Sequence, residues 1–373
     1  MRGTRYCPHP APRTPHPMTL PVNQDYNIHL APITSEHFDW LRGKNYAGWV
    51  VIMDELTQAH CLPLIEEHLR GLPVVKITVP AGERHKHLDT CRYLWEEMFK
   101  GGAGRRWCCL NLGGGVIGDM GGFVASTFKR GMDFVQIPTT LLSQVDASVG
   151  GKLGIDFYDV KNSIGLFANP QAVWIDVRFL DTLPARELRS GYAEVIKHAL
   201  IADEQQWREL REVNDLSTFD WQTVISQSVD IKRRIVEEDP YERGRRKALN
   251  FGHTIGHAIE SYFLHRDDRM LHGEAIAAGM IAEAYLSVEA GLLSRTELEE
   301  ITTYLLDVYG HQSLPESAYP EMIDLMRQDK KNDTDEINFT FLEAAGRAVV
   351  NKTATVEEIS RSLDFYNRLS VEA

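Results

Sequence analysis

Cysteine, long apolar runs and positive charge are all scarce in this chain. Its five cysteines are odd in number, and no two of them form a C-x-x-C pair. Cys108 and Cys109 are consecutive in an apolar stretch, where a strand would turn them to opposite faces. We therefore expect buried thiols in a reducing cytoplasm rather than a disulfide framework.

No apolar run approaches the length of a membrane span, so we expect no membrane partner. The formal net charge of -13 argues against a nucleic-acid-binding protein. With 373 residues, 43% of them hydrophobic, the chain has room for two domains with well-buried cores. Residues 1–17 are rich in Pro, Arg and His and lack the apolar core of a secretory signal. They are predicted to be a disordered extension, or the product of a start placed too early, with Met18 as the alternative start.

Short apolar, β-branched runs alternate with helical spacing of apolar residues between residues 49 and 180. The predicted strands are 49–54, 74–79, 107–112, 134–137 and 172–177, and the predicted helices between them are 57–70 and 87–100. This alternation predicts a parallel sheet with right-handed crossovers, a Rossmann-like α/β domain over residues 18–184.

Long helical patterns replace the strands after about Leu183. The predicted helices are 186–203, 220–238, 250–263, 273–291 and 296–309. A small hairpin over 337–350 and a final helix capped by Thr355, with Glu358 three residues on, complete an otherwise all-α domain over residues 185–373.

A glycine-rich loop, Gly113 to Gly118, follows an apolar run and is predicted to open a helix. Glycines there let the backbone approach a phosphate at a helix N-terminus. The loop follows the third predicted strand rather than the first, so a tight strand-to-helix turn explains it about as well as a nucleotide site.

Two histidines, His253 and His257, are four residues apart and would share one face of a helix. His272 and Glu194 are candidates to complete a divalent-metal site with them. Taken singly, each histidine is more simply a core or surface residue, and Glu194 with Lys197 is more simply an exposed ion pair. Gly252 and Gly256 weaken the predicted helix by about 1 kcal/mol each, which indicates close approach by another group.

In their order along the chain, these stretches resemble the 3-dehydroquinate synthase family of sugar-phosphate cyclases. The resemblance rests on Gly113 to Asp119, Thr139 to Lys152, Lys161 with Asn162, Leu188 to Lys197, Asn250 to His257, Leu271 to Glu274 and Asp329 to Lys331. It implies an N-terminal NAD domain, a C-terminal α-helical metal domain and a homodimer in the cytoplasm.

The resemblance also implies roles for individual residues. Zinc or cobalt would be bound by Glu194, His253 and His272, so that His257 turns to the substrate instead. The substrate would be surrounded by Asp146, Lys152, Asn162, Lys197, Lys232, Arg246, Asn250, His257 and one of Lys330 and Lys331, with Arg130 reaching the phosphate in the neighbouring subunit. NAD would contact Asp54, Gly82, Glu83, Lys86, Gly114, Gly115, Val116, Ile117, Gly118, Asp119, Thr139, Thr140, Lys152, Lys161, Phe179, Leu180 and Thr182.

The implied reaction is the shikimate-pathway conversion of 3-deoxy-D-arabino-heptulosonate 7-phosphate to 3-dehydroquinate, by a carbon–oxygen lyase. NAD would remove and return a hydride, phosphate would leave, and an intramolecular aldol would close the ring. Two alternatives stay open. One is a cyclase for a substrate without the carboxylate, such as 2-epi-5-epi-valiolone synthase, and the other is a metal-dependent polyol dehydrogenase that releases NADH. The retained Lys232, Arg246, Asn250 and His257 favour the carboxylated substrate.

Overall fold

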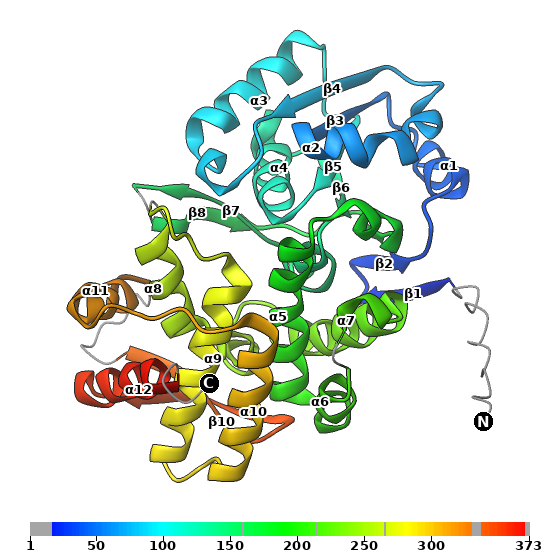
Figure 1. The fold of residues 1–373 in the computed structure, drawn as a ribbon. Coiled ribbons are helices and arrows are strands. Elements are labelled where there is room, and N and C mark those ends of the chain that lie inside the picture. Colours follow the sequence, from blue (N-terminus) through cyan, green and yellow to red (C-terminus); the bar gives the residue numbers. More distant parts are fainter. Residues whose placement is uncertain (1–16, 159, 214, 265, 330–336, 370–373) are drawn as a thin grey trace, which may run out of the picture.

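The computed structural model describes residues 17–158, 160–213, 215–264, 266–329 and 337–369. Residues 1–16 of the predicted extension, and Lys330 and Lys331, lie outside the described residues. Figure 1 shows two parts: a twisted sheet flanked by helices, drawn in blue and cyan, and a helical half drawn in green to red.

In the described chain, a seven-stranded sheet has the order β1-β2-β9-β6-β5-β3-β4. Its strands are parallel except for β1, which runs antiparallel to β2. The strands are β1 (Met18–Val22), β2 (Tyr26–Leu30), β3 (Gly48–Asp54), β4 (Val74–Val79), β5 (Trp107–Gly113), β6 (Asp133–Pro138) and β9 (Ala172–Ile175). The parallel sheet that the sequence predicted is confirmed, with β1 and β2 as additions that the sequence pattern did not reveal.

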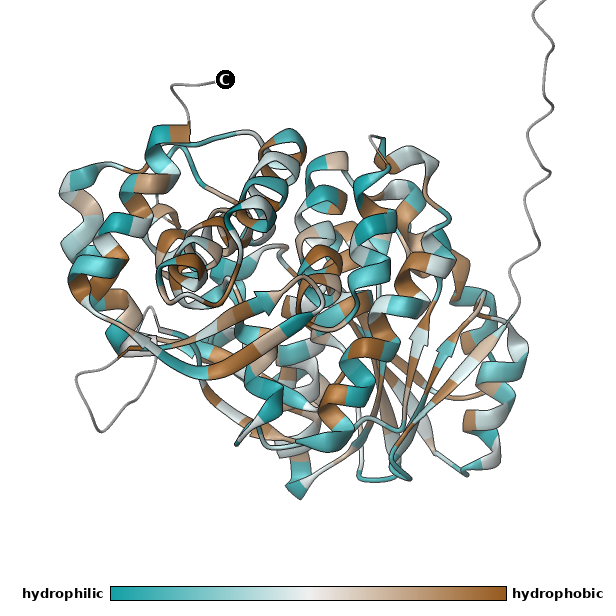
Figure 2. Ribbon diagram, turned by 90° about the horizontal axis from the view of Figure 1, so that it is seen from below, coloured by the Kyte–Doolittle hydropathy of each residue, from teal (hydrophilic) through white to brown (hydrophobic). Residues whose placement is uncertain are grey.

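Both faces of the sheet are covered, which explains the continuous apolar runs. In β3, Val50 and Ile52 join one core cluster with α3 (Leu88–Lys100) and α4 (Gly115–Thr127). Trp49, Val51 and Met53 point the other way and join a second cluster with α1 (Ser35–Gly43). Alternate side chains of a strand point to opposite faces, so a strand buried on both sides needs no polar residue. Figure 2 shows apolar residues concentrated along the strands and on helix faces turned inward.

One predicted helix is wrong in extent. Residues 57–70 form α2 (Glu55–His60) and then two short 3-10 helices, Leu62–Leu64 and Glu66–Leu69. Pro63, in the first turn of the first 3-10 helix, has no N–H to donate to the preceding turn, so the α-helix ends before it. The sequence pattern also missed the hairpin of β7 (Lys152–Phe157) and β8 (Val160–Phe167), which lies where the two parts of the molecule meet.

The helical half is built around α9, which contacts α5, α8, α10 and α12. Its elements are α5 (Ala185–Ala202), α6 (Glu204–Arg211), α7 (Trp221–Glu238), α8 (His253–Phe263), α9 (His272–Glu289), α10 (Arg295–Tyr309), α11 (Tyr319–Asp329), β10 (Ile337–Ala344), β11 (Arg347–Ala354) and α12 (Val356–Arg368). The predicted hairpin and the Thr355–Glu358 capping box are both present. No helix of the described residues is long and apolar enough to cross a membrane.

The glycines beside the histidines serve the packing of α8 on α9. Gly252 was predicted to lie inside the helix. It instead precedes the helix, as the N-cap of α8, with a left-handed φ of 77°. A Cβ on Gly256 would lie 2.7 Å from Ile276 Cδ1, and one on Gly279 would lie 2.1 Å from the Gly252 carbonyl oxygen. The close approach that these glycines indicated is therefore made by α9.

The largest hydrophobic cluster joins the two parts of the chain. It contains Ile28 and Leu30 of β2 and Ile175 of β9 together with the cores of the helices from α5 onward. Since the last strand of the sheet ends at Ile175 and α5 begins at Ala185, we propose the division of the chain at residue 184.

Candidate active site

The candidate nucleotide-binding residues gather at the carboxyl edge of the parallel sheet. From β3 the chain goes to β4 on one side and then to β5 on the other, so the strand order reverses between β3 and β5. Open parallel sheets bind ligands in the crevice at such a point. The glycine-rich loop follows β5 and so lies directly at this reversal of strand order, which explains why it need not follow the first strand. The other predicted contacts follow neighbouring strands: Asp54 after β3; Gly82, Glu83 and Lys86 after β4; Thr139 and Thr140 after β6; and Phe179, Leu180 and Thr182 after β9.

The loop after β5 lies so close to its neighbours that side chains at Gly113 and Gly114 would crowd them. A Cβ on Gly114 would lie 3.1 Å from Thr140 Cγ2, and one on Gly113 would lie 2.5 Å from Ile117 Cβ. Gly114 is the N-cap of α4, and no described side chain caps that helix. Its first N–H groups therefore have no side-chain acceptor among the described residues, an arrangement that fits the pyrophosphate of a dinucleotide.

Lys86 joins three of the predicted segments from a nearly fully buried position. Its Nζ lies 2.7 Å from Asp119 Oδ2 and 2.5 Å from Asn162 Oδ1. Asp119 belongs to α4 and Asn162 to β8. Asn162 was predicted near the substrate, and here its amide oxygen contacts the nucleotide-side lysine.

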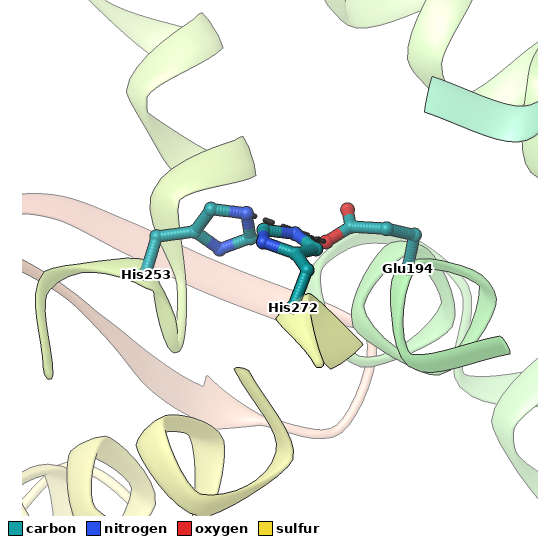
Figure 3. A group of neighbouring side chains, drawn as sticks. All are labelled: Glu194, His253 and His272. Atoms are coloured by element: carbon teal, nitrogen blue, oxygen red, sulfur yellow. Dashed lines mark hydrogen bonds and ion pairs between the residues drawn. The ribbon is translucent and has the colours of Figure 1, made fainter. Parts of the chain in front are cut away.

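Glu194, His253 and His272 come together although 78 residues separate the first from the last in sequence (Figure 3). Glu194 is fully buried in α5, while the histidines are the first residues of α8 and α9. The Nε2 atoms of His253 and His272 each lie 3.3 Å from Glu194 Oε1. The three candidate ligand atoms lie within 4.8 Å of one another. Two imidazole nitrogens and a carboxylate oxygen are a donor set that fits zinc or cobalt and leaves coordination positions for a substrate.

Buried charged groups shift the pKa of each member of this cluster. Burial alone would raise the pKa of Glu194, but Lys197 and His253 hold that pKa well below its usual range. Burial and Lys197 lower the pKa of His253 to about 4. Burial would also lower the pKa of His272, yet the carboxylates of Glu260 and Glu194 raise it to about 9. His272 thus lies between two carboxylates, Glu194 at 3.3 Å and Glu260 at 3.1 Å.

His257 lies beside this cluster on α8, with its ring centre 5.0 Å from that of His253 and 5.8 Å from that of His272. It also belongs to a second possible ligand group with Glu260 and His272. One imidazole presents one nitrogen to an ion, and His272 Nε2 already faces Glu194 and His253. The first group is therefore the candidate metal site, and His257 borders it.

Asp146 is the centre of a group of cations. It lies in a short π-helical turn, Ser143–Ala147, a distortion that is frequent at functional sites. Its Oδ1 lies 2.8 Å from Lys232 Nζ, 3.8 Å from Lys197 Nζ and 3.3 Å from His198 Nε2. Burial lowers the pKa of Lys232 to about 8, against the attraction of Asp146. These buried ammonium groups suit an anionic, hydroxylated ligand.

Two more predicted substrate residues contact one carboxylate. Glu242 forms an ion pair with Lys152, and its Oε1 accepts a hydrogen bond of 2.8 Å from Asn250 Nδ2. Arg246 is almost fully buried and donates to the carbonyl oxygens of Pro240 and Gly150 at 2.6 and 3.1 Å. Its Nε has no hydrogen-bond partner among the described residues, so one buried donor remains for a ligand.

Arg130 does not join this group. It is exposed in the 3-10 turn, Phe128–Arg130, that follows α4. Because α4 begins at the carboxyl end of β5 and leads back to the start of β6, Arg130 lies at the opposite edge of the sheet.

Three residues of the site were missed from the sequence. Glu260 lies three residues after His257 on α8 and contacts His272. His198 contacts Asp146, and Glu242 contacts Lys152 and Asn250. Only Glu260 had a detectable pattern, since positions 253, 257 and 260 share a helical face.

Comparison with known proteins agrees with this geometry. The family model described as 3-dehydroquinate synthase N-terminal matches residues 76–190, and the one described as 3-dehydroquinate synthase C-terminal matches residues 191–332. A 3-dehydroquinate synthase from Parabacteroides distasonis is 41% identical over 337 residues, which cover 90% of this chain and 95% of that protein. One from Nitratiruptor sp. is 43% identical over 351 residues, which cover 93% and 97%.

Solved structures share the fold at lower identity. The 2-epi-5-epi-valiolone synthase ValA from Streptomyces hygroscopicus, with NAD+ and Zn2+ bound, matches with a TM-score of 0.83 at 24% identity, covering 94% of this chain and 99% of that one. A 2-deoxy-scyllo-inosose synthase complexed with carbaglucose-6-phosphate, NAD+ and Co2+ matches with a TM-score of 0.81 at 23% identity, covering 94% and 100%. At this identity the likeness establishes the fold: a Rossmann-like sheet domain joined to a helical domain.

Proposed function

Because the chain belongs to the 3-dehydroquinate synthase family, we propose that it converts 3-deoxy-D-arabino-heptulosonate 7-phosphate to 3-dehydroquinate and phosphate, as a carbon–oxygen lyase of the shikimate pathway. The observation that carries the proposal is the identity of about two residues in five with curated 3-dehydroquinate synthases over nine tenths of both chains. The cluster of Glu194, His253 and His272 beside buried lysines supports it.

The site fits NAD and a divalent metal, zinc or cobalt. The N-terminus of α4, which no described side chain caps, suits a pyrophosphate, and the donor set of the cluster suits either metal. When bound, NAD would take and return one hydride while the metal polarises substrate oxygens, so that the reaction is redox-neutral.

The residues of the chain would mainly bind and orient the substrate. Lys232 and the free Nε of Arg246 would receive the carboxylate, because charge-assisted hydrogen bonds to a buried cation are strong. Asp146, held by Lys197 and Lys232, would accept hydrogen bonds from substrate hydroxyls. Fixing several groups of one substrate in this way favours intramolecular steps such as the aldol closure.

We also propose that the protein acts as a homodimer in the cytoplasm. Arg130 lies at the edge of the sheet away from its own site, so it would bind the substrate phosphate only in a neighbouring subunit. The described cysteines, Cys61, Cys91, Cys108 and Cys109, are buried free thiols, as a reducing compartment allows.

The proposal is tested by phosphate release from the heptulosonate phosphate with metal and substoichiometric NAD. We expect many phosphate ions per NAD and no accumulation of NADH. Sedoheptulose 7-phosphate, which lacks the carboxylate, is the matched control and should not be turned over. Stoichiometric NADH would instead indicate a polyol dehydrogenase, and preferential turnover of the control would indicate another cyclase.

A further inference from the structure

Glu260 connects the candidate metal site to the opposite half of the molecule. It lies on α8, with 5% of its surface exposed. Its Oε2 lies 3.1 Å from His272 Nδ1, and its Oε1 lies 2.5 Å from Lys161 Nζ. Lys161 belongs to β8, in the hairpin between the sheet and the helical half. One buried carboxylate therefore joins a candidate metal ligand to a residue predicted to serve NAD.

The contact determines which nitrogen of His272 can bind a metal. An ionised carboxylate only accepts hydrogen bonds, so the nitrogen that faces Glu260 must carry a proton. With Nδ1 kept protonated as the donor to Glu260, Nε2, which lies 3.3 Å from Glu194 Oε1, is the nitrogen that would give up its proton to bind an ion. Carboxylates behind ligating histidines commonly fix the ring and its tautomer in this way.

Glu260 is poorly placed to bind the ion itself. Both of its oxygens already have donors, one an ammonium group and the other the ring N–H of His272. The Lys161 ammonium would repel a divalent cation at Oε1. Lys161 also lies 3.8 Å from Glu83 Oε1, so its position depends on the loop after β4 as well.

We propose that Glu260 is a positioning residue that orients His272 for the metal, and that Lys161 holds Glu260 in place, so that metal affinity depends on a contact between the two halves. The inference rests on the proposed function, because it takes the Glu194, His253 and His272 cluster as the metal site. It adds a determinant of metal affinity that lies outside the ligand set.

The test is the metal affinity of apoprotein, measured by competition with a chromophoric chelator, for the full-length protein and its variants. Glu260→Gln keeps the shape of the side chain, but its single oxygen cannot accept from both Lys161 and His272. We expect Zn2+ and Co2+ to bind about 10- to 100-fold more weakly, the usual effect of losing such a contact. The visible absorption of the Co2+ protein should shift in position while cobalt remains bound, because the His272 ring is reoriented and not lost.

Two further variants are measured beside Glu260→Gln. Lys161→Met leaves Glu260 in place but removes its support, so we expect a smaller loss of affinity. If Glu260→Gln does not fold, the metal affinity of Lys161→Met tests the inference in its place. The matched control is Glu300→Gln, which removes an ion pair of 2.6 Å between α10 and Arg211 of α6 and should leave metal affinity unchanged.

The outcomes separate the inference from the proposed function. If the unaltered protein binds no metal, the metal part of the proposed function fails. If the unaltered protein binds metal and Glu260→Gln binds metal with the same affinity, the inference is overturned. If Glu260→Gln does not fold, an unchanged metal affinity in Lys161→Met overturns it. Complete loss of the cobalt absorption in Glu260→Gln would also overturn it, by making Glu260 a ligand.

Discussion

Raising the pH should weaken substrate binding through a single buried lysine. Lys232 has 5% of its surface exposed, and burial lowers its pKa to about 8 even though Asp146 lies 2.8 Å away. Lys197 and Arg246 also lower it, so two nearby cations disfavour the charged form. Below pH 8 the ammonium is present, and as the pH rises through 8 it is lost.

The size of the effect follows from that pKa. At pH 9 only about one molecule in ten retains the Lys232 ammonium, whereas about nine in ten do at pH 7. If the carboxylated substrate binds only the protonated form, KM should rise about tenfold over this interval, or about 1.4 kcal/mol of binding free energy. kcat should change less, because saturating substrate restores the proton.

Steady-state kinetics of phosphate release across this pH range, with Lys232→Met beside the unaltered protein, checks the reasoning. The variant should have a raised KM that no longer depends on pH in this window. Lys100→Met, which removes an exposed lysine paired with Glu97, should retain the full pH profile. A KM that rises above pH 8 in Lys232→Met as well would refute the assignment, and so would a pH-independent KM in the unaltered protein.

Two other substitutions test the cluster and its support. His272→Ala should lose bound metal and activity together, measured by elemental analysis and phosphate release, and full metal occupancy would rule out His272 as a ligand. Gly279→Ala places a Cβ 2.1 Å from the Gly252 carbonyl oxygen, so α8 and α9 must separate. We expect a loss of about 1–3 kcal/mol in the free energy of unfolding. The control is Gly43→Ala, where nothing lies within 4 Å of the added Cβ. Equal stability of the two variants would contradict the packing argument.

Most of the fold could be predicted from local sequence patterns. Runs such as 49–54 are apolar throughout because both faces are covered, and the Thr355–Glu358 capping box needs only residues within one turn. The hairpin of β7 and β8 was missed because its strands are partly exposed and interrupted by glycines that read as a loop. Within 57–70, Pro63 is the local signal that ends the α-helix.

The site was harder to predict, because its contacts are long-range. His253 and His257 are four residues apart, and it is His253 whose Nε2 lies 3.3 Å from Glu194 Oε1, a contact that depends on how α5 and α8 both pack against α9. The resemblance to a known family supplied the grouping of Glu194, His253 and His272. Glu260 shares a helical face with His253 and His257, but its contacts with His272 and Lys161 could be identified only from the structure.

The hydrophobic cluster that joins β2 and β9 to the helical half bears on how the chain folds. The family models divide the chain near residue 190, but Ile28, Leu30 and Ile175 are buried in the same core as the helices beyond that point. A fragment cut at residue 184 would expose these side chains to water, and the complementary fragment would lack the strands that close its core. The boundary between the family models therefore does not coincide with a boundary in the hydrophobic core, and we expect the two parts to unfold together.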